Sequence, residues 1–295
     1  MDQPSLYSRY SELQHADNLF VLERYLRLLR WDGVAPPGAG AGVGVGAADR
    51  GGPYAVLDVG VGDGHFAVEV LVPRLPGNCE RFVGVDSSEA MVTFANQHYR
   101  SRCMEFVHLD ISSETVEASL ECSFDHVFSF YTLHWVKRQR QAFHNIYKLL
   151  KPGGDALLTF LATNPIYDIH QIMAKNKKWK PYIKTDYIAP YHQKKHPEKQ
   201  LENVLKKTGF VKYMCRVENR THQFHGYDIL RKSINAVNPI LSKLTGDDAE
   251  DYMNDFMDEV RHLPSVKIEK INNNEETITI HYKLFIVYAV KPDDT

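Results

Sequence analysis

The sequence predicts an α/β fold built on a mostly parallel sheet, and three features of the chain support this prediction. Short apolar runs alternate with amphipathic helical patterns between residues 54 and 162, as parallel strands and their connecting helices do. A glycine-rich turn, LDVGVGDG at residues 57–64, completes the first apolar run. An acidic residue ends each of three successive predicted strands. Because such sheets bind ligands beyond the carboxyl ends of their strands, we expect a site at this edge.

Seven strands are expected, with helices on both faces of the sheet. The helical patterns within the alternating region are HFAVEVLVPRL, SEAMVTFANQHYR and RQAFHNIYKLLKPGG. The last of these stops at Pro152, which cannot continue a helix, and Gly153 accepts the left-handed turn that follows. The expected strands are residues 54–59, 81–86, 103–110, 124–130, 154–162, 210–220 and 277–291.

The whole chain, residues 1–295, is expected to form a single domain. Apolar residues at helical spacing near the start predict a helical N-terminal lid over residues 1–34. Residues 35–53 are rich in glycine and alanine and carry little apolar bulk, which predicts a flexible insertion. The remaining expected parts are a cofactor-binding core at 54–163, a helical substrate cap at 164–207 and 225–276, and a closing strand at 277–295.

Composition argues against several classes of partner and site. The 35 basic and 37 acidic residues give a net charge of −2, so a nucleic-acid partner is not expected. The four cysteines show no paired spacing, which argues against a disulfide framework or a zinc site. No secretion signal and no membrane-length apolar run is seen, so we expect a cytoplasmic protein without membrane insertion. The sequence leaves open whether the chain forms a homodimer.

The glycine turn is compatible with more than one kind of ligand. A phosphate-binding P-loop needs Lys followed by Ser or Thr after the glycines, whereas this chain has His65 and Phe66 there. A dinucleotide turn needs G-x-G-x-x-G or G-x-G-x-x-A, and residues Gly62 to Ala67 match the second form. On spacing alone, an NAD-dependent oxidoreductase therefore remains open.

The carboxylate of Asp58 separates these ligands. It stands two residues before Gly60, where it would repel a pyrophosphate and attract an ammonium group. S-adenosylmethionine carries an ammonium group and a sulfonium charge but no phosphate. Asp86 ends the second strand, where a carboxylate can accept both ribose hydroxyls. Asp110 ends the third strand, next to Ile111, where an adenine amino group would lie.

With these acids in place, residues 54–162 resemble the class I S-adenosylmethionine-dependent methyltransferases, a Rossmann-like α/β family. The segments DVGVGDG, VGVDSS, HLDI and KLLKPGGDALLTF are similar to the family's motifs. The resemblance implies S-adenosyl-L-methionine as cofactor and S-adenosyl-L-homocysteine as product. We expect no metal site. The residues it assigns to the cofactor are Asp58, Gly60, Gly62, Gly64, Asp86, Ser87, Asp110, Ile111, Ser129 and Phe130.

A closer resemblance spans nearly the whole chain apart from the glycine-rich insertion. SLYSRYSELQHAD, FDHVFSFYTLHWV, NPIYDI, IAPYH and HYKLFIVYAVK together resemble the insect juvenile hormone acid O-methyltransferases. This resemblance implies methyl transfer to the carboxylate of juvenile hormone acid or farnesoic acid, in juvenile hormone biosynthesis. It also points to Gln14 and Trp135 as the catalytic residues that hold the carboxylate, through their amide and indole N–H groups.

Carboxyl methylation requires no general base from the protein if the acid is already ionised. A carboxylic acid with a pKa of about 4.3 is ionised at pH 7, so we nominate no general base and assign His134 a packing role. A sesquiterpenoid tail needs a long apolar pocket with few polar groups. The residues expected to line that pocket are Tyr131, Ile166, Tyr167, Ile169, Met173, Trp179 and Tyr191.

Two further alternatives are compatible with the sequence. A carboxyl methyltransferase of the trans-aconitate type would need several arginines near the cap, and the candidates are Arg216, Arg220 and Arg231. A catalytically silent protein that binds the apolar acid without reacting would share the same pocket. A comparison of farnesoic acid with trans-aconitate as acceptors tests the first alternative, and an assay of methyl-ester formation tests the second.

Overall fold

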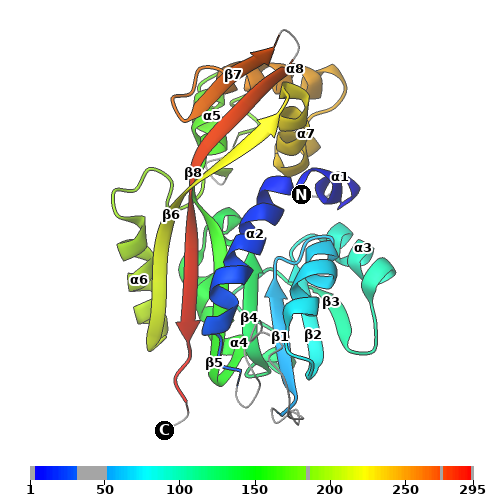
Figure 1. Ribbon diagram of the computed structural model, residues 1–295, viewed down its shortest axis with the longest axis vertical. Coiled ribbons are helices and arrows are strands. Elements are labelled where there is room, and N and C mark those ends of the chain that lie inside the picture. The colour runs from blue at the N-terminus through cyan, green and yellow to red at the C-terminus, as the bar shows by residue number, and fades with distance from the viewer. Residues whose placement is uncertain (1–3, 32–51, 184–186, 273–274, 294–295) are drawn as a thin grey trace.

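The computed structural model describes residues 4–31, 52–183, 187–272 and 275–293. Figure 1 shows a sheet in the lower part of the molecule whose longest strands continue upward into a smaller cap. The insertion predicted at residues 35–53 lies outside the described residues except for Gly52 and Pro53. In the part of the chain that the structure describes, no helix has the length and apolar character needed to cross a membrane.

Eight strands form one mixed sheet in the described residues. They are β1 (Tyr54–Val59), β2 (Cys79–Asp86), β3 (Met104–His108), β4 (Phe124–Phe130), β5 (Leu150–Thr163), β6 (Lys212–His225), β7 (Val266–Asn272) and β8 (Glu275–Val290). The order is β3-β2-β1-β4-β5-β8-β6, and β7 pairs with β8 outside this path. β1 to β5 are parallel to one another, whereas β8 is antiparallel to β5, β6 and β7. The mostly parallel sheet is therefore confirmed.

Strand β7 departs from the prediction that residues 225–276 are helical. Its sequence, VKIEKIN, alternates apolar and polar residues, which is the pattern of a strand with one covered face. β6 also extends to His225, five residues beyond the expected 210–220. The two long antiparallel strands carry the cap away from the core, and β7 adds an eighth strand to the seven expected.

Eight α-helices surround this sheet in the described residues. They are α1 (Pro4–Tyr10), α2 (Glu12–Tyr25), α3 (Glu89–Tyr99), α4 (Gln139–Leu149), α5 (Pro165–Met173), α6 (Pro197–Thr208), α7 (Tyr227–Val237) and α8 (Asp247–Val260). The helix expected after β1 is irregular, with a π-helical turn at Ala67–Leu71 and a 3₁₀ turn at Val72–Arg74. Pro73 has no N–H for the next α-helical hydrogen bond, so a regular helix cannot continue there.

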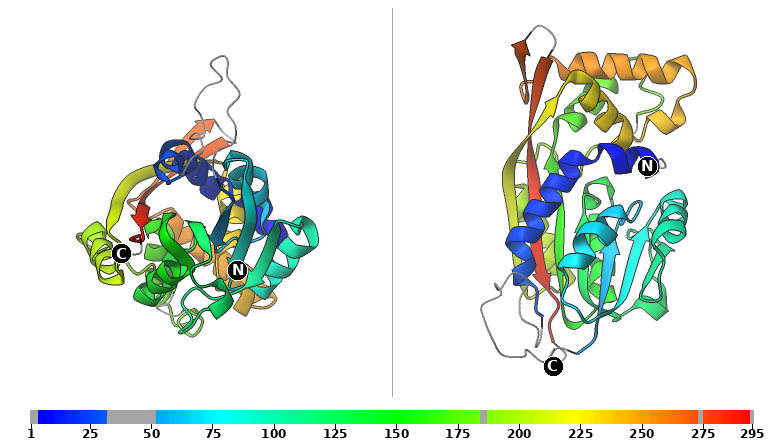
Figure 2. Two further views of the ribbon diagram at one scale, coloured as in Figure 1. Left: turned by 90° about the horizontal axis from the view of Figure 1, so that it is seen from below. Right: turned by 45° about the vertical axis from the view of Figure 1, so that its right-hand side comes forward.

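Alternate side chains of the central strands enter two separate apolar cores. Val56 and Phe128 belong to the core that includes α2 and α3, whereas Leu57 and Val127 belong to the core that includes α4 and α6. Successive residues of a strand point to opposite faces, so each face of the sheet needs its own helical cover. Figure 2 shows helices on both sides of the sheet, as predicted.

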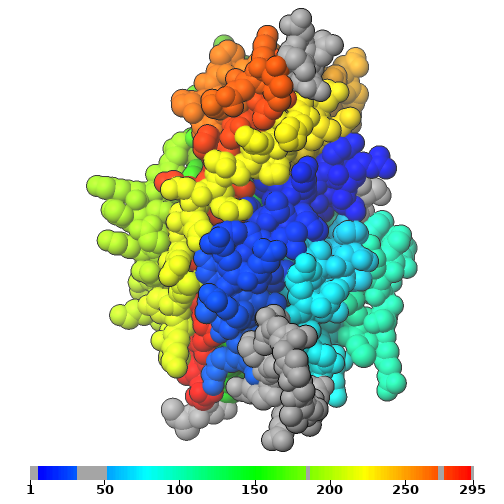
Figure 3. Space-filling view, viewed as in Figure 1, coloured from blue at the N-terminus to red at the C-terminus, as the bar shows by residue number. Residues whose placement is uncertain are grey.

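Helix α2 is fastened to the sheet by the buried carboxylate of Asp17, which is 1% exposed. Oδ2 of Asp17 accepts hydrogen bonds from the hydroxyls of Tyr131 and Tyr282, the second at 2.8 Å. Arg220 donates to Oδ1 from Nε and from Nη2, both at 2.9 Å. Figure 3 shows the N-terminal helices packed across this face, beside β6. A buried carboxylate is tolerated here because a guanidinium and two hydroxyls satisfy it.

Substitution of Asp17 tests this attachment. Asp17→Asn is expected to lower the free energy of unfolding by about 3 kcal/mol, because it leaves the Arg220 guanidinium without its buried counter-ion. Glu23→Gln, at an exposed position of the same helix, is the matched control and should change it by less than about 0.5 kcal/mol. Urea denaturation of the three proteins at one pH measures both effects. Equal stability of the Asp17 variant and the control would contradict the assignment.

Candidate active site

The turn after β1 is shaped by three glycines with left-handed backbone. Gly60, Gly62 and Gly64 have φ values of +77°, +61° and +82°, a region that residues with a Cβ disfavour. The Gly60 N–H donates to the carbonyl of Val85 at 2.7 Å, which holds the turn against β2. A Cβ on Gly60 would lie 1.9 Å from Oγ1 of Thr132, so the position has no room for a side chain.

Two of the predicted acids organise the backbone at the strand ends. Asp86 accepts hydrogen bonds from the N–H groups of Gly62 at 3.0 Å and Ser88 at 2.9 Å. Asp110 accepts from the N–H and the hydroxyl of Ser112, both at 2.8 Å. Since a carboxylate already occupies the Gly62 N–H, this amide is not available to a pyrophosphate.

The third acid, Asp58, lies beneath the turn and is 3% exposed. Its Oδ1 has no hydrogen-bond partner among the described residues. Burial, and next the nearby carboxylate of Asp86, raise the pKa of Asp58 to about 8. A buried acceptor without a donor is unfavourable, so this position gains most from a cationic or hydrogen-bonding ligand group.

A cavity of about 350 Å³ opens above the turn. Its wall contains most of the positions that the sequence assigned to the cofactor: Gly60, Gly62, Asp86, Ser87, Asp110, Ile111 and Phe130. The carboxyl ends of β1 to β4 therefore bring these residues to one place, as the parallel sheet predicts.

Asp58, Gly64 and Ser129 are not part of that wall. The Ser129 hydroxyl is buried and donates to the carbonyl of Val59 at 2.8 Å, so it supports β1 from β4. A Cβ on Gly64 would lie 3.1 Å from Ala95, which shows that this glycine allows α3 to pack closely. Of Ser129 and Phe130, which the resemblance assigns to the cofactor, only Phe130 lines the cavity.

Tyr7 is a wall residue that the sequence pattern did not predict. It belongs to α1 and lines the cavity above the glycine turn, where a Cβ on Gly62 would lie 3.8 Å from its ring. Burial, followed by the carboxylates of Asp63, Asp86 and Asp58, raises the pKa of its phenol. Its sequence context, SLYSRY, contains no signal for this position, because the contact depends on how α1 lies across the sheet edge.

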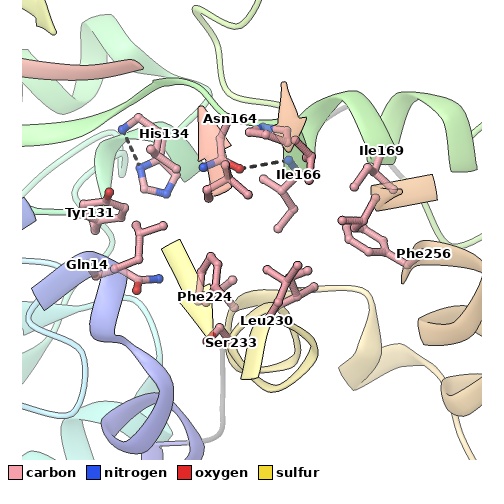
Figure 4. A pocket seen from close by; sticks show the side chains of 18 of the residues that line it. Gln14, Tyr131, His134, Asn164, Ile166, Ile169, Phe224, Leu230, Ser233 and Phe256 are labelled. Atoms are coloured by element: carbon pink, nitrogen blue, oxygen red, sulfur yellow. Dashed lines mark hydrogen bonds between the residues drawn. The ribbon is translucent and has the colours of Figure 1, made fainter. Parts of the chain in front are cut away.

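A second, largely apolar cavity lies between α2 and the cap. Gln14, Tyr131 and His134 line one end of it, and Ile169 and Phe256 line the other (Figure 4). None of the described residues in its wall carries a formal charge at neutral pH. The cavity therefore suits an apolar molecule with a single polar end.

Gln14 and Trp135, the residues predicted to hold a carboxylate, both line this apolar cavity. Neither side chain has a hydrogen-bond partner among the described residues, so their amide and indole N–H groups are available to a ligand. The structure thus brings together two residues that are 121 positions apart in the chain.

The predicted tail pocket is only partly correct. Tyr131, Ile166 and Ile169 line the apolar cavity, but Tyr167, Met173, Trp179 and Tyr191 do not. Trp179 is buried in the cap, where its indole N–H donates to Asp255 at 2.6 Å. Tyr191 packs against Phe285 on the opposite face of the sheet, at 5.1 Å between ring centroids. Tyr167 and Met173 are core residues on the buried side of α5.

The rest of the tail pocket comes from residues that the sequence pattern did not name, although α7 and α8 lie within the helical cap predicted at residues 225–276. These residues are Phe224 of β6, Leu230, Ile234 and Val237 of α7, Phe256 and Val260 of α8, Val266 of β7 and Ile280 of β8. Amphipathic spacing in α7 and α8 indicates that each helix buries a face, but it does not indicate which element the face meets. The position of these helices depends on the long β6–β8 pair, a contact between distant residues.

The two cavities share a wall made of Tyr7, Tyr131 and Trp135. Tyr131 has a φ of +55°, which is rare for a tyrosine, and its hydroxyl is bound by Asp17. The strained turn directs the chain from β4 into the 3₁₀ turn Leu133–Trp135. A molecule in the apolar cavity can therefore meet one held over the glycine turn.

His134 does not have the properties of a general base. Burial lowers the pKa of its imidazole to about 3, so the ring is neutral at physiological pH. Nδ1 accepts a hydrogen bond from the N–H of Leu161 at 3.3 Å. The last residue pair between β4 and β5 is Phe130 with Thr159, so β4 offers no carbonyl group to the N–H of Leu161. The imidazole of His134 accepts this hydrogen bond instead. This contact agrees with the structural role predicted for His134.

The packing around Gly60 generates a stability prediction. Gly60→Ala is expected to lower the free energy of unfolding by about 2 kcal/mol or more, because φ is positive and Thr132 fills the space. Gly77→Ala is the matched control, since no atom lies within 4 Å of its Cβ position. Thermal and urea unfolding should show an effect at the first position only. Equal effects at both would contradict the described turn.

Asp58 generates a prediction for pH. Its folded pKa of about 8 lies above the ordinary 3.8, so between these values the folded protein holds a proton that the unfolded chain has lost. This contribution to stability is complete below about pH 4 and is lost as the pH rises through about 8. The stability of the ligand-free protein relative to Asp58→Asn should fall over that range by on the order of 1 kcal/mol per pH unit. Urea titrations at several pH values measure it, and a pH-independent difference would contradict the burial of a protonated Asp58.

Comparison with known proteins agrees with this architecture. Residues 57–158 match the family model described as Methyltransferase domain. A putative methyltransferase from Bacillus halodurans has a similar structure, with a TM-score of 0.52 and 17% identity over 82% of this chain and 94% of that one. The YcgJ protein from Bacillus subtilis gives a TM-score of 0.50 and 19% identity over 82% and 93% of the two chains. These likenesses confirm the class I methyltransferase fold.

The cofactor of this fold, S-adenosylmethionine, fits the residues around the glycine turn. The buried Oδ1 of Asp58 has no hydrogen-bond partner among the described residues, so the ammonium group of the cofactor would satisfy it and would favour the ionised form of this carboxyl group. Asp86 and Asp110 supply carboxylates on the cavity wall, where they can accept hydrogen bonds from ribose and adenine. When bound, the cofactor supplies an electrophilic methyl group on a sulfonium.

Two curated relatives match almost the complete chain. The juvenile hormone acid O-methyltransferase of Bombyx mori is 34% identical over 99% of this chain and 98% of its own length. The enzyme of the same name from Drosophila melanogaster is 34% identical over 99% of this chain and 93% of its own length. The NAD-dependent alternative has no support in these matches. The chain belongs to the family of juvenile hormone acid O-methyltransferases and is an S-adenosylmethionine-dependent methyltransferase.

Proposed function

We propose that this protein methylates the carboxylate of juvenile hormone acid or farnesoic acid, with S-adenosylmethionine as the methyl donor. The observation that carries the proposal is the apolar cavity with neutral polar groups at one end and a wall shared with the cavity over the glycine turn. The names of the two full-length relatives support the same class of substrate.

The acceptor needs no base in this reaction. With a pKa of about 4.3, the carboxylic acid is already ionised at pH 7. Gln14 and Trp135 donate hydrogen bonds to the carboxylate without a full positive charge, so its oxygen keeps its nucleophilicity. A lysine or arginine at the same place would bind the acid more strongly but would reduce the reactivity of the lone pair.

Rate enhancement then comes from orientation and the exclusion of water. Correct alignment of two reactants can supply about 7 to 11 kcal/mol in favourable cases. Tyr131 and Trp135 occupy the junction of the cavities, where they fix the direction from which the carboxylate approaches. The apolar wall formed by α5, α7 and α8 removes water from the tail and leaves the carboxylate as the polar end.

The apolar cavity must widen before the terpenoid tail can bind. The apolar cavity has a volume of about 90 Å³, whereas pockets for molecules of this size are roughly 300 Å³ or larger. Phe256 and Leu230 extend into it from opposite helices (Figure 4). Rotation of such side chains, or a shift of α7 and α8 relative to α5, opens the space along the direction of the tail.

The composition of the wall disfavours a polyacid such as trans-aconitate. Arg220 pairs with Asp17, and Arg231 pairs with Glu250 at 2.7 Å. Arg216 is exposed on β6. None of the three lines the apolar cavity, so two additional carboxylates would be buried there without counter-ions.

Product analysis tests the proposed function. Incubation with S-adenosylmethionine should convert farnesoic acid and juvenile hormone acid to methyl esters, with kcat/KM at least about 100-fold above that for trans-aconitate, because additional buried charges have no partner. Mass spectrometry identifies the products, and equilibrium binding of NAD serves as a control for the dinucleotide alternative. Preferential methylation of trans-aconitate, or no ester from either terpenoid acid, would overturn the proposal.

A further inference from the structure

We infer that His134 is a third hydrogen-bond donor to the acceptor carboxylate, acting through its Nε2–H beside Gln14 and Trp135. The inference rests on the proposed function and names a residue that contacts the reacting group. It differs from the packing role because it assigns separate tasks to the two nitrogens of the ring. Nδ1 is occupied by the protein, and Nε2 is left for the ligand.

The hydrogen bond at Nδ1 determines the tautomer of the ring. Nδ1 accepts the N–H of Leu161 at 3.3 Å, and an imidazole nitrogen that accepts a main-chain N–H cannot carry a proton. In a neutral ring the proton must then lie on Nε2. Because burial lowers the pKa of the ring to about 3, this neutral form persists across the physiological range. His134 is therefore a permanent donor at Nε2.

The Nε2 donor is directed at the apolar cavity. Nε2 has no hydrogen-bond partner among the described residues, although the residue is only 2% exposed. His134 belongs to the wall of the apolar cavity, and Figure 4 shows the second ring nitrogen turned toward the open centre of that cavity. Because this N–H borders the cavity and has no acceptor among the described residues, a ligand carboxylate at this end can accept its hydrogen bond.

Neighbouring aromatic rings hold the imidazole in place. Tyr131 contacts its edge with 5.7 Å between ring centroids, and Trp135 lies at 5.0 Å. Tyr167 lies at 6.4 Å from a third direction. These rings and the Leu161 hydrogen bond hold the imidazole in one orientation, so little entropy is lost when it donates to a ligand.

The chemistry of the cavity also favours a neutral donor. A carboxylate can accept several hydrogen bonds through its two oxygens, and the amide of Gln14 and the indole of Trp135 do not exhaust them. A protonated histidine would form a charged pair and reduce the nucleophilicity of the oxygen. A neutral imidazole adds a hydrogen bond and leaves the negative charge on the acid.

Two substitutions of His134 distinguish its proposed role as a hydrogen-bond donor to the ligand from its structural role as the acceptor for the Leu161 N–H. His134→Asn keeps an acceptor near Nδ1 for the Leu161 N–H but removes the Nε2 donor. His134→Gln places an amide N–H near the position of Nε2 and serves as the matched rescue variant. The probes are farnesoic acid and farnesol, which share a tail but differ in the carboxylate, each titrated in the presence of S-adenosylhomocysteine.

In wild type, farnesoic acid should bind more tightly than farnesol. His134→Asn should lower the affinity for farnesoic acid by about tenfold or more, because a hydrogen bond to a charged group is lost. Its affinity for farnesol should stay within about twofold of the wild-type value. His134→Gln should restore most of the preference for the acid. Unchanged binding of farnesoic acid to His134→Asn, or equal weakening of both ligands, would overturn the donor role.

A measurement on the unmodified protein keeps the inference testable if a variant does not fold. In ¹⁵N-histidine NMR, the Nε2–H proton of His134 should move downfield on addition of farnesoic acid and not on addition of farnesol. No shift with the acid would overturn the inference. A wild-type protein that binds neither terpenoid, or that prefers farnesol, would instead overturn the proposed function on which the inference rests.

Discussion

The structure depends on one buried carboxylate, Asp17. Its oxygens bind residues that lie 114, 203 and 265 positions later in the chain, and so they connect α2 with the end of β4, with β6 and with β8. Gln14 lies one helical turn before Asp17, so this anchor also fixes Gln14. The same carboxylate holds Tyr131, whose backbone is in a left-handed conformation. One ionic cluster thereby determines where the acceptor residues meet the sheet.

The two cavities provide different electrostatic environments for the two reactants. Around the glycine turn, Asp86 provides a carboxylate, and the buried Asp58 becomes ionised when the ammonium group of the cofactor binds beside it. In the apolar cavity, Gln14, His134 and Trp135 offer only neutral polar groups to the acid. Negative protein charge near the acceptor would repel it, and positive charge would reduce its reactivity. The wall at Tyr131 and Trp135 therefore separates two different environments while it brings the reactants together.

Local patterns predicted the parts of the fold that depend on neighbouring residues. Apolar runs located the core strands, and the acids and glycines at their ends located the wall of the cofactor cavity. Residues 266–272 were missed as a strand, although their alternation was present in the sequence. Seven residues are too few to exclude a helix when the partner strand is unknown.

The apolar site depends on contacts that no local pattern specifies. Trp179 and Tyr191 are aromatic residues of the kind that line apolar pockets. In the folded protein, however, Trp179 donates to Asp255 and Tyr191 packs against Phe285. Phe224 and Phe256 reach the cavity only because the β6–β8 pair carries the cap over α2. Gln14 and Trp135 were found through family resemblance, since an isolated glutamine or tryptophan carries no signal of its own. The hydrogen bond from Leu161 to His134 depends on where β4 ends, which is a property of the folded sheet.

A crystal structure with S-adenosylhomocysteine and farnesoic acid bound together tests the central claim most directly. We predict the homocysteine amine over Asp58 and the carboxylate of the acid between Gln14 and Trp135, with the terpenoid tail directed toward Phe256. A carboxylate bound at the Phe256 end, or an acid bound in a cavity that does not share the Tyr131 wall, would contradict it.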